Sequence, residues 1–311
     1  MQDRPAHVDE SELLALVRAH WDPDVDALDH QPVGFGAHHW RATAGGEARW
    51  FVTVDELGRR HDAKSLESAY AGAASLHAAG LDFLHVPAVA GSGTYTLPLP
   101  AESHRLAVSV TPWLGDAREP GAPGAEAELL ARLHAARPVP LPEWAPRVPA
   151  SFVDDLAVLL DRPWTDGPLG EEARALTADR RSRVEGWYEE YAALSRTVDP
   201  DEFVVTHGEP GVHNQLVTGG RVVLVDTESL MLAPAERDVS GLWPVGRDWL
   251  DRYGSVPRQD RLRLFDLEWV LTEVDEYTAW LGGPHSGGPD DVVALGGLRT
   301  ELDKDLGQGL S

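Results

Sequence analysis

The first part of the chain shows a helical spacing of apolar residues, followed by the two-residue alternation of β-strands. A helix is expected to begin at Ser11, whose hydroxyl suits an N-cap, and to end before Pro23. From about Gln31, two β-prone runs flank the Gly45-Gly46 pair. Because paired glycines between strand-like runs favour a tight turn, this segment is predicted to form a hairpin.

The rest of the chain changes from a strand pattern to a helical one. An alanine-rich helix is expected over residues 62–80, with Asp62 as its cap and Gly80 as its end. Further strands are expected over residues 86–90, 94–97, 106–110, 203–206, 215–218 and 221–225, and further helices over residues 125–136, 151–160, 171–194 and 258–281. Residues 115–124 and 138–149 are predicted to be connectors, and the end of the chain a loop with an acidic tail.

These elements predict an α+β fold with two lobes. The 311 residues provide enough material for one large domain or two medium ones, each with a real core. A small β-rich N-lobe is expected over residues 1–111 and a larger, mainly α-helical C-lobe over residues 112–311, with a hinge near residues 110–113.

The charge balance limits the classes of partner. The chain has 27 basic and 51 acidic residues, a formal net charge of −24. Nucleic acids and anionic membranes attract basic surfaces, so neither is expected as a partner. An acidic protein is compatible with a small-molecule substrate that is hydroxylated and cationic.

The absence of cysteine removes another set of functions. Disulfides, thiolate metal sites, iron–sulfur clusters and cysteine nucleophiles are all excluded. The first residues lack the basic-then-apolar layout of a signal peptide, and no run approaches the roughly 18 apolar residues of a membrane span. We therefore expect a cytoplasmic protein, monomeric or dimeric.

The most informative segment lies between residues 206 and 228. Gly219 and Gly220 predict a two-residue hairpin turn, so counting back along both strands brings Asn214 and Asp226 to the same open end. Glu209 lies in the loop that leads to that end. Two carboxylates and an amide provide oxygen ligands for Mg²⁺ and one spare carboxylate. Phosphoryl transfer requires such a set, because a metal must bind the phosphates and a base must face the attacking hydroxyl.

This segment resembles a known catalytic loop. The run His207-Gly-Glu-Pro-Gly-Val-His-Asn214 is similar to the His-x-Asp-x-x-x-x-Asn loop of the aminoglycoside phosphotransferase family, relatives of choline kinases and protein kinases. Asp226 matches the family's metal-binding aspartate, and the run beginning Val33-Gly-Phe-Gly resembles its nucleotide loop. The overall character is similar to spectinomycin phosphotransferases. The resemblance implies a protein-kinase-like fold with a β-rich N-lobe and a helical C-lobe.

The resemblance also implies roles for individual residues. Glu209 would be the catalytic base or orient the hydroxyl, and His207 would brace the catalytic loop. Asn214 and Asp226 would hold Mg²⁺ on the phosphates of ATP or GTP. The nucleotide would be bound by the glycine-rich loop, the lysine position, the following helix and the hinge, represented by Gly34, Gly36, Thr53, Glu67, Val110 and Trp113. Glu228 is a candidate for recognising a substrate amine, with a simple turn cap as the alternative.

Two positions depart from the family pattern. The base is Glu209 where the family usually has aspartate, which moves the carboxylate by more than about 1 Å. Thr53 stands where the lysine that pairs with the α- and β-phosphates is expected. The replacement cation could be Lys64, Arg41 or Arg49.

The sequence therefore predicts a kinase that phosphorylates a hydroxyl of an aminocyclitol, aminoglycoside or nucleoside-like natural product, in antibiotic resistance or self-protection. A housekeeping kinase of choline type shares this chemistry. The alternative is a non-catalytic, pseudokinase-like regulator that binds a nucleotide or metabolite, since the lysine is missing and the base is altered. A polar turn without function and a zinc site of His207, Glu209 and His213 are weaker alternatives, because the spacing lacks the helical zinc motif.

Overall fold

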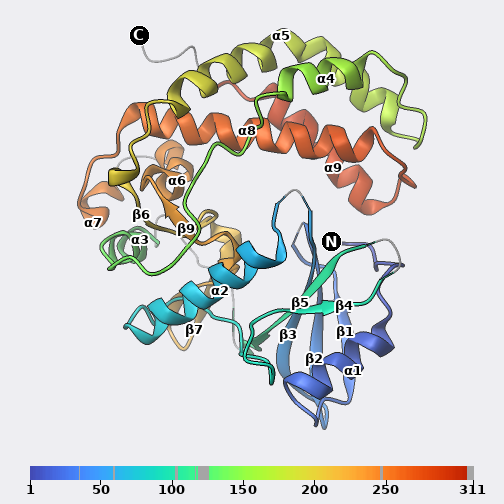
Figure 1. Ribbon diagram of the computed structural model, residues 1–311, viewed down its shortest axis with the longest axis vertical. Coiled ribbons are helices and arrows are strands. Elements are labelled where there is room, and N and C mark those ends of the chain that lie inside the picture. Colours follow the sequence, from blue (N-terminus) through green and yellow to red (C-terminus); the bar gives the residue numbers. More distant parts are fainter. Residues whose placement is uncertain are drawn as a thin grey trace. The chain divides into compact units, whose positions relative to one another are not determined.

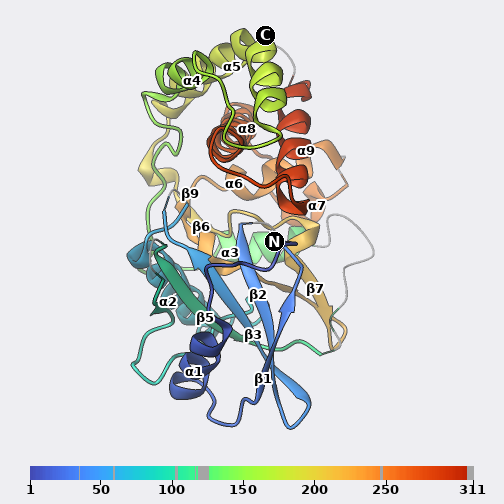
Figure 2. The same cartoon turned by 90° about the vertical axis from the view of Figure 1, so that its right-hand side faces the viewer.

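The chain forms two compact units, shown in Figure 1 and, from the side, in Figure 2. The computed structural model describes residues 1–34, 36–58, 60–101, 104–115, 117, 126–245 and 248–306. The first unit comprises residues 1–143, 204–233 and 245–255, and the second comprises residues 144–203, 234–244 and 256–311. The lobe boundary between residues 111 and 112 stays a prediction. Most of the predicted connector at residues 115–124 lies outside the described residues.

A five-stranded antiparallel sheet organises the first unit. Its strand order is β1-β2-β3-β5-β4. The strands are β1 (Ala27–Gln31), β2 (Ala37–Ala44), β3 (Glu47–Glu56), β4 (Leu97–Leu99) and β5 (Leu106–Pro112), and the helices α1 (Glu10–His20) and α2 (Ala63–Ala78) accompany them. The hairpin predicted around Gly45 and Gly46 is confirmed, since both residues have the positive φ that a tight turn between β2 and β3 requires. The strand β1 was not expected from the sequence.

The alternation along the strands divides the sheet into an apolar and a polar face. Val52 and Val54 of β3 are buried in a core with α1 and with residues of β2 and β5. The residues between and after them, Thr53 and Asp55, point to the opposite face because successive strand residues alternate. On that face Tyr70 of α2 packs with β5. The polar face of β3 therefore looks toward α2.

The helices α1 and α2 begin at side-chain caps. Helix α1 is capped by Asp9, whose carboxylate accepts hydrogen bonds from the N–H groups of Ser11 and Glu12, so the expectation that Ser11 is the cap is wrong. Asp9 is favoured over Ser11 as the cap because a carboxylate near the helix N-terminus also interacts favourably with the helix dipole. The cap predicted for α2 is confirmed, since Asp62 and Ser65 form a reciprocal capping box.

The remaining elements of the first unit surround the predicted catalytic loop. They are α3 (Ala127–His134), β6 (Val204–Thr206), β7 (Gln215–Thr218), β8 (Arg221–Leu224), β9 (Met231–Ala233) and α7 (Leu250–Tyr253), with the 3-10 turns η2 (Val212–Asn214) and η3 (Thr227–Ser229). The β7–β8 hairpin has the predicted register, with Thr218 opposite Arg221. The backbone of Leu224 also exchanges hydrogen bonds with Phe83 and His85, at 2.7 and 2.8 Å. No strand forms over residues 86–90, contrary to expectation, and the next strand is β4 rather than residues 94–97.

The second unit is helical over its described residues. It contains α4 (Phe152–Leu160), α5 (Gly170–Ser195), η1 (Pro200–Glu202), α6 (Glu236–Val239), α8 (Gln259–Leu281) and α9 (Pro289–Asp303), and η4 (Ser240–Val245) runs to its boundary. Figure 1 shows α8 running beside α5 and α9, which it contacts. The acidic tail, for which no helix was predicted, forms α9, which buries Leu298 and Leu302. These leucines lie four residues apart and thus on one helix face. Among the described residues, none of the helices is long and apolar enough to cross a membrane.

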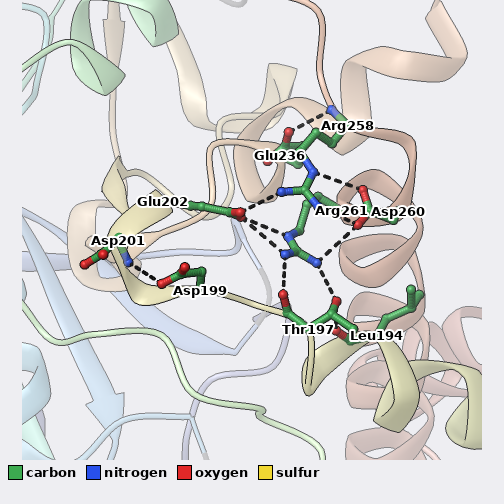
Figure 3. Close-up of polar contacts among 9 residues, drawn as sticks. All are labelled: Leu194, Thr197, Asp199, Asp201, Glu202, Glu236, Arg258, Asp260 and Arg261. Atoms are coloured by element: carbon green, nitrogen blue, oxygen red, sulfur yellow. Dashed lines mark hydrogen bonds and ion pairs between the residues drawn. The ribbon is translucent and has the colours of Figure 1, made fainter.

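A buried guanidinium holds the segment after α5 against the start of α8. The side chain of Arg261 is 1% exposed. It donates hydrogen bonds to the hydroxyl and the carbonyl of Thr197, at 2.8 and 2.6 Å, and to the carboxylate of Glu202. Figure 3 shows these contacts, together with the ion pair to Asp260. Because arginine offers several donors in a fixed plane, one side chain satisfies all these acceptors.

We expect Arg261→Met to lower the free energy of unfolding by about 2–4 kcal/mol, because the acceptors of Thr197 and Glu202 lose their buried partner. The matched control is Arg299→Met, which breaks a pair with Glu172 whose side chains are both about half exposed. That change is expected to cost no more than about 0.5 kcal/mol. Equal losses in urea denaturation of the two variants would contradict the structural role of Arg261.

Candidate active site

The predicted catalytic loop is anchored by a buried histidine. His207 is fully buried directly after β6, and its Nε2 lies 2.9 Å from the carbonyl oxygen of Val225. Gly208 follows with a φ of 102°, which allows the chain to turn sharply out of the strand. The structure thus places His207 as a link between the catalytic loop and the end of β8.

The loop carries Glu209 and Asn214 toward the open end of the hairpin. The side-chain amide of Asn214 donates a hydrogen bond to the carbonyl oxygen of Glu209 at 2.9 Å. The carbonyl of Asn214 accepts from the N–H of Val225 at 3.0 Å, the pairing that the hairpin register predicts. The amide nitrogen of Asn214 is thus used inside the loop, and its amide oxygen is the atom that could act as a ligand. Asp226 is the next residue after Val225, so the two predicted metal ligands are neighbours across the hairpin.

Asp226 has an unusual backbone conformation. Its φ and ψ are 66° and 58°, and it is the one non-glycine residue with positive φ among the described residues. This left-handed conformation costs an ordinary residue about 1–2 kcal/mol. The conformation turns the chain from β8 into η3, and the Asp226 side chain is exposed. A strained, exposed carboxylate at a strand end is typical of a functional position.

Further carboxylates lie close to Asp226. Glu228, in η3, has its pKa raised well above the usual value by burial and by the charge of Asp226, with which it shares a hydrogen bond. Asp55, on the polar face of β3, is 9% exposed. Burial and the charge of Asp226 raise its pKa to about 7. Glu228 Oε2 and Asp55 Oδ2 are both buried without a hydrogen-bond partner. Glu209 also contributes to the negative field at Glu228.

We define the acidic cluster as Asp55, Glu209, Asp226 and Glu228. Helix α2 lies beside this cluster and contributes Tyr70. Tyr70 of α2 is buried, and burial together with the charges of Asp55 and Glu228 raises the pKa of its hydroxyl. The Tyr70 hydroxyl lies 3.4 Å from Ser109 Oγ of β5. Helix α2 also packs against η3, which carries Glu228.

The sequence did not lead us to Asp55, Tyr70 or Ser109. The sequence could have indicated Asp55, because it lies two residues after Thr53 and therefore on the same face of the strand. Tyr70 and Ser109 gave no such signal, since their proximity depends on how α2 packs on the sheet.

The predicted nucleotide loop contains two glycines with positive φ. Gly34 has a φ of 70° and Gly36 a φ of 95°, which side chains rarely adopt. A Cβ on Gly34 would lie 3.1 Å from Nε2 of His39, and one on Gly36 would lie 2.9 Å from Nη1 of Arg60. The loop is therefore closely covered by a ring and a guanidinium. Phe35 between them lies outside the described residues.

No lysine stands at the expected position in β3. Thr53 lies there, and its hydroxyl is 3.2 Å from Nδ1 of His39. Burial lowers the pKa of His39 to about 3, so this imidazole is neutral at pH 7 and supplies no positive charge.

The three cations suggested as replacements for the lysine lie in other places. Arg41 is paired with Asp29 at 2.8 Å and Arg49 with Asp22 at 3.1 Å. Lys64 is exposed in the first turn of α2. Arg60, which covers Gly36, is a cation beside the nucleotide loop that the sequence did not suggest.

The three remaining predicted nucleotide residues have defined places. Glu67 accepts hydrogen bonds from the backbone of Tyr95 and Thr96 at 2.9–3.0 Å, so its carboxylate holds that loop. Val110 is buried in the core on the α1 side of the sheet. Trp113 is half-buried, and its ring lies 6.2 Å from that of Phe51. Their binding roles stay predictions.

The donor set fits a hard cation. Asn214, Asp226 and Glu228 offer amide and carboxylate oxygens, the ligands that Mg²⁺ prefers. A bound cation would stabilise the ionised forms of Asp55 and Glu228, whose buried oxygens have no hydrogen-bond partner and whose pKa values are raised by burial and by Asp226. A zinc site of His207, Glu209 and His213 is not supported, because in the described part of the chain these residues do not bring their ligand atoms together.

Comparison with known proteins identifies relatives of this chain. A family model described as the phosphotransferase enzyme family matches residues 29–277. Protein StrN from Streptomyces griseus is 32% identical over 249 residues, which are 70% of this chain and 74% of that protein.

Solved structures share the fold at lower identity. Spectinomycin phosphotransferase APH(9)-Ia, crystallised with ADP and spectinomycin, has a TM-score of 0.73 and 16% identity, with 95% of both chains covered. Choline kinase LicA from Streptococcus pneumoniae has a TM-score of 0.58 and 13% identity, with 94% of this chain and 98% of that chain covered. The two-lobed, kinase-like α+β fold expected from the sequence is confirmed.

The strain at Asp226 can be measured through stability. We expect Asp226→Gly to be more stable than Asp226→Ala by about 1 kcal/mol, because glycine adopts the left-handed conformation without strain and alanine does not. Both variants remove the carboxylate, so their difference isolates the backbone. Urea denaturation without metal measures this difference, and an alanine variant at least as stable as the glycine variant would contradict the strain.

The raised pKa of Asp55 predicts a pH-dependent stability. Its folded-state pKa of about 7 exceeds the usual 3.8 of the unfolded chain. The folded state therefore binds the proton more tightly, and the contribution of Asp55 to stability falls as pH rises from 3.8 to about 7. We expect Asp55→Asn to relieve this loss. The change in the free energy of unfolding that it causes should be about 2 kcal/mol more favourable at about pH 8.5 than at about pH 5.5.

The control for that measurement is Glu47→Gln on the same strand. Glu47 is exposed, so its replacement is expected to show no such pH dependence. Denaturation in metal-free buffer at both pH values provides the comparison. A stabilisation by Asp55→Asn that is constant with pH would contradict the raised pKa.

Proposed function

The chain belongs to the phosphotransferase enzyme family, and from this premise we propose that it transfers the γ-phosphate of ATP or GTP to a hydroxyl group of an amine-bearing natural product in the cytoplasm. The acceptor class is an aminocyclitol, an aminoglycoside or a nucleoside-like compound. The single observation that carries the proposal is the acidic cluster around Asp226, built by the catalytic loop, η3 and β3.

Asn214 and two members of the acidic cluster would have separate roles in the reaction. Asn214 and Asp226 would hold Mg²⁺, which offsets the charge of the nucleotide phosphates. Glu209 would accept the hydroxyl proton of the acceptor. The acceptor oxygen then bonds to the γ-phosphorus, and the bond from that phosphorus to the β–γ bridging oxygen breaks. The products are a phosphate monoester, the nucleoside diphosphate and the proton.

The nucleotide loop would cover the phosphates with backbone. The positive φ values of Gly34 and Gly36 allow this backbone to turn tightly, and the loop would then lie over the phosphates. In place of the missing lysine we propose the guanidinium of Arg60, which lies against Gly36. His39 is neutral and would form part of the wall of the nucleotide site, without supplying charge.

The preference for an amine-bearing acceptor follows from charge. Because the pKa values of Asp55 and Glu228 are raised, a bound cation would favour their ionised forms, and these would add negative potential beyond that of two metal ligands. The structural neighbours include enzymes named for spectinomycin, amicoumacin and choline, and one solved with gentamicin. The compounds in these names carry amine or quaternary ammonium groups, which supports a cationic acceptor. Because spectinomycin and gentamicin are antibiotics, we propose a role in antibiotic resistance or self-protection.

The proposal is tested by incubating the protein with Mg-ATP or Mg-GTP and a panel of spectinomycin, gentamicin, amicoumacin, choline and a nucleoside. Mass spectrometry detects the gain of one phosphate. We expect transfer to at least one amine-bearing acceptor, and Glu209→Gln to lower kcat by about 10²–10⁴-fold because the base is lost. Glu209→Asp keeps the carboxylate, so its kcat should lie between those of the wild type and of Glu209→Gln.

The control variant is Glu47→Gln, an exposed change that should leave kcat unaltered. Wild-type activity in Glu209→Gln would contradict the assigned base. The missing lysine favours a second candidate, a regulator that binds nucleotide without transfer. A nucleotide-induced rise in Tm with no transfer to any acceptor would favour that candidate and overturn the proposal.

A further inference from the structure

A cluster of imidazole and carboxylate groups lies at the end of β3, on residues that the phosphotransferase site does not use. His7, Glu56 and His104 bring their ligand atoms within 4.8 Å of one another. Nδ1 of His104 lies 2.9 Å from Oε1 of Glu56. The rings of His7 and His104 are stacked, with centroids 4.0 Å apart.

Each member is held by the fold rather than by a loose surface contact. Glu56 is the last residue of β3 and pairs with Leu106 at the start of β5, two residues after His104. His7 lies between Pro5, which is buried, and Asp9, which caps α1. Val8, the neighbour of His7, is anchored in the core. The three side chains are therefore brought together by three separate segments.

From this juxtaposition we propose that His7, Glu56 and His104 form a binding site for a divalent transition metal such as Zn²⁺. Two imidazoles and one carboxylate are a ligand set that Zn²⁺ accepts, with water in the remaining position. Mg²⁺ prefers oxygen ligands only, so this site differs in metal preference from the acidic cluster. Zn²⁺ ligands in tetrahedral sites lie about 3.4 Å apart, so rotation of partly exposed side chains closes the gap.

A metal at this site would tie the segment before α1 to the sheet. That segment also touches the nucleotide loop, since the ammonium group of Met1 donates hydrogen bonds to the carbonyl oxygens of Val33 and Gly34, both at 2.8 Å. Binding to the folded state alone stabilises it by mass action, so the metal should raise Tm. This expectation is independent of phosphate transfer.

The test uses the full chain without an affinity tag, stripped of metal and kept in excess Mg²⁺. We expect one equivalent of Zn²⁺ to bind by calorimetry, a rise in Tm, and the d–d absorption of low-coordinate Co²⁺ when Co²⁺ replaces it. His7→Ala, His104→Ala and Glu56→Gln should each weaken Zn²⁺ binding by about 10-fold or more. Their Tm values without metal show whether each variant folds.

His20→Ala is the matched control, because His20 lies in the last turn of α1, outside the cluster. It should bind Zn²⁺ like the wild type. Failure of the wild type to bind one equivalent would overturn the proposal. Equal Zn²⁺ affinity in the wild type and in all three site variants would overturn it too, since binding would then arise from other histidines.

Discussion

The register of β3 is the constraint on which the candidate site depends. Val52 and Val54 are held in the core with α1, and a shift of one residue would expose both. With that register fixed, Thr53 and Asp55 must lie on the other face. Hydrophobic burial on one side of the strand thus determines where a carboxylate sits on the other side.

This constraint sets the electrostatics of the first unit. Asp55 faces the negative field of Asp226, and both oxygens without partners, on Asp55 and Glu228, are buried. Where related kinases are expected to place a lysine, this chain has Thr53 beside a neutral His39. Without that lysine, the proposed nucleotide site would depend on bound cations and on Arg60, beside Gly36, for its positive charge. An amine-bearing acceptor fits the same balance, because it adds positive charge where the protein supplies little.

Local patterns in the sequence predicted much of this structure. The Gly219-Gly220 turn fixed the pairing of Asn214 with Val225, because a two-residue hairpin leaves one register. The helix cap at Asp62 was likewise predictable, because it depends only on residues close to it in the sequence. The contributions of Tyr70 and Ser109 were not predictable, since they depend on the packing of α2 against β5. The helix α9 was not predicted, because acidic residues obscured the spacing of its buried leucines.

Buried charge serves two different purposes in this molecule. In the second unit, Glu268 is 5% exposed and accepts hydrogen bonds from Trp144 and Tyr191, at 3.0 and 2.7 Å. Such a satisfied group holds segments in place and needs no ligand. Asp55 is nearly as buried, yet Oδ2 has no hydrogen-bond partner, and the nearby charge is of the same sign. An unsatisfied carboxylate lowers stability, so its retention beside Asp226 is best explained by a positively charged ligand that satisfies it when bound.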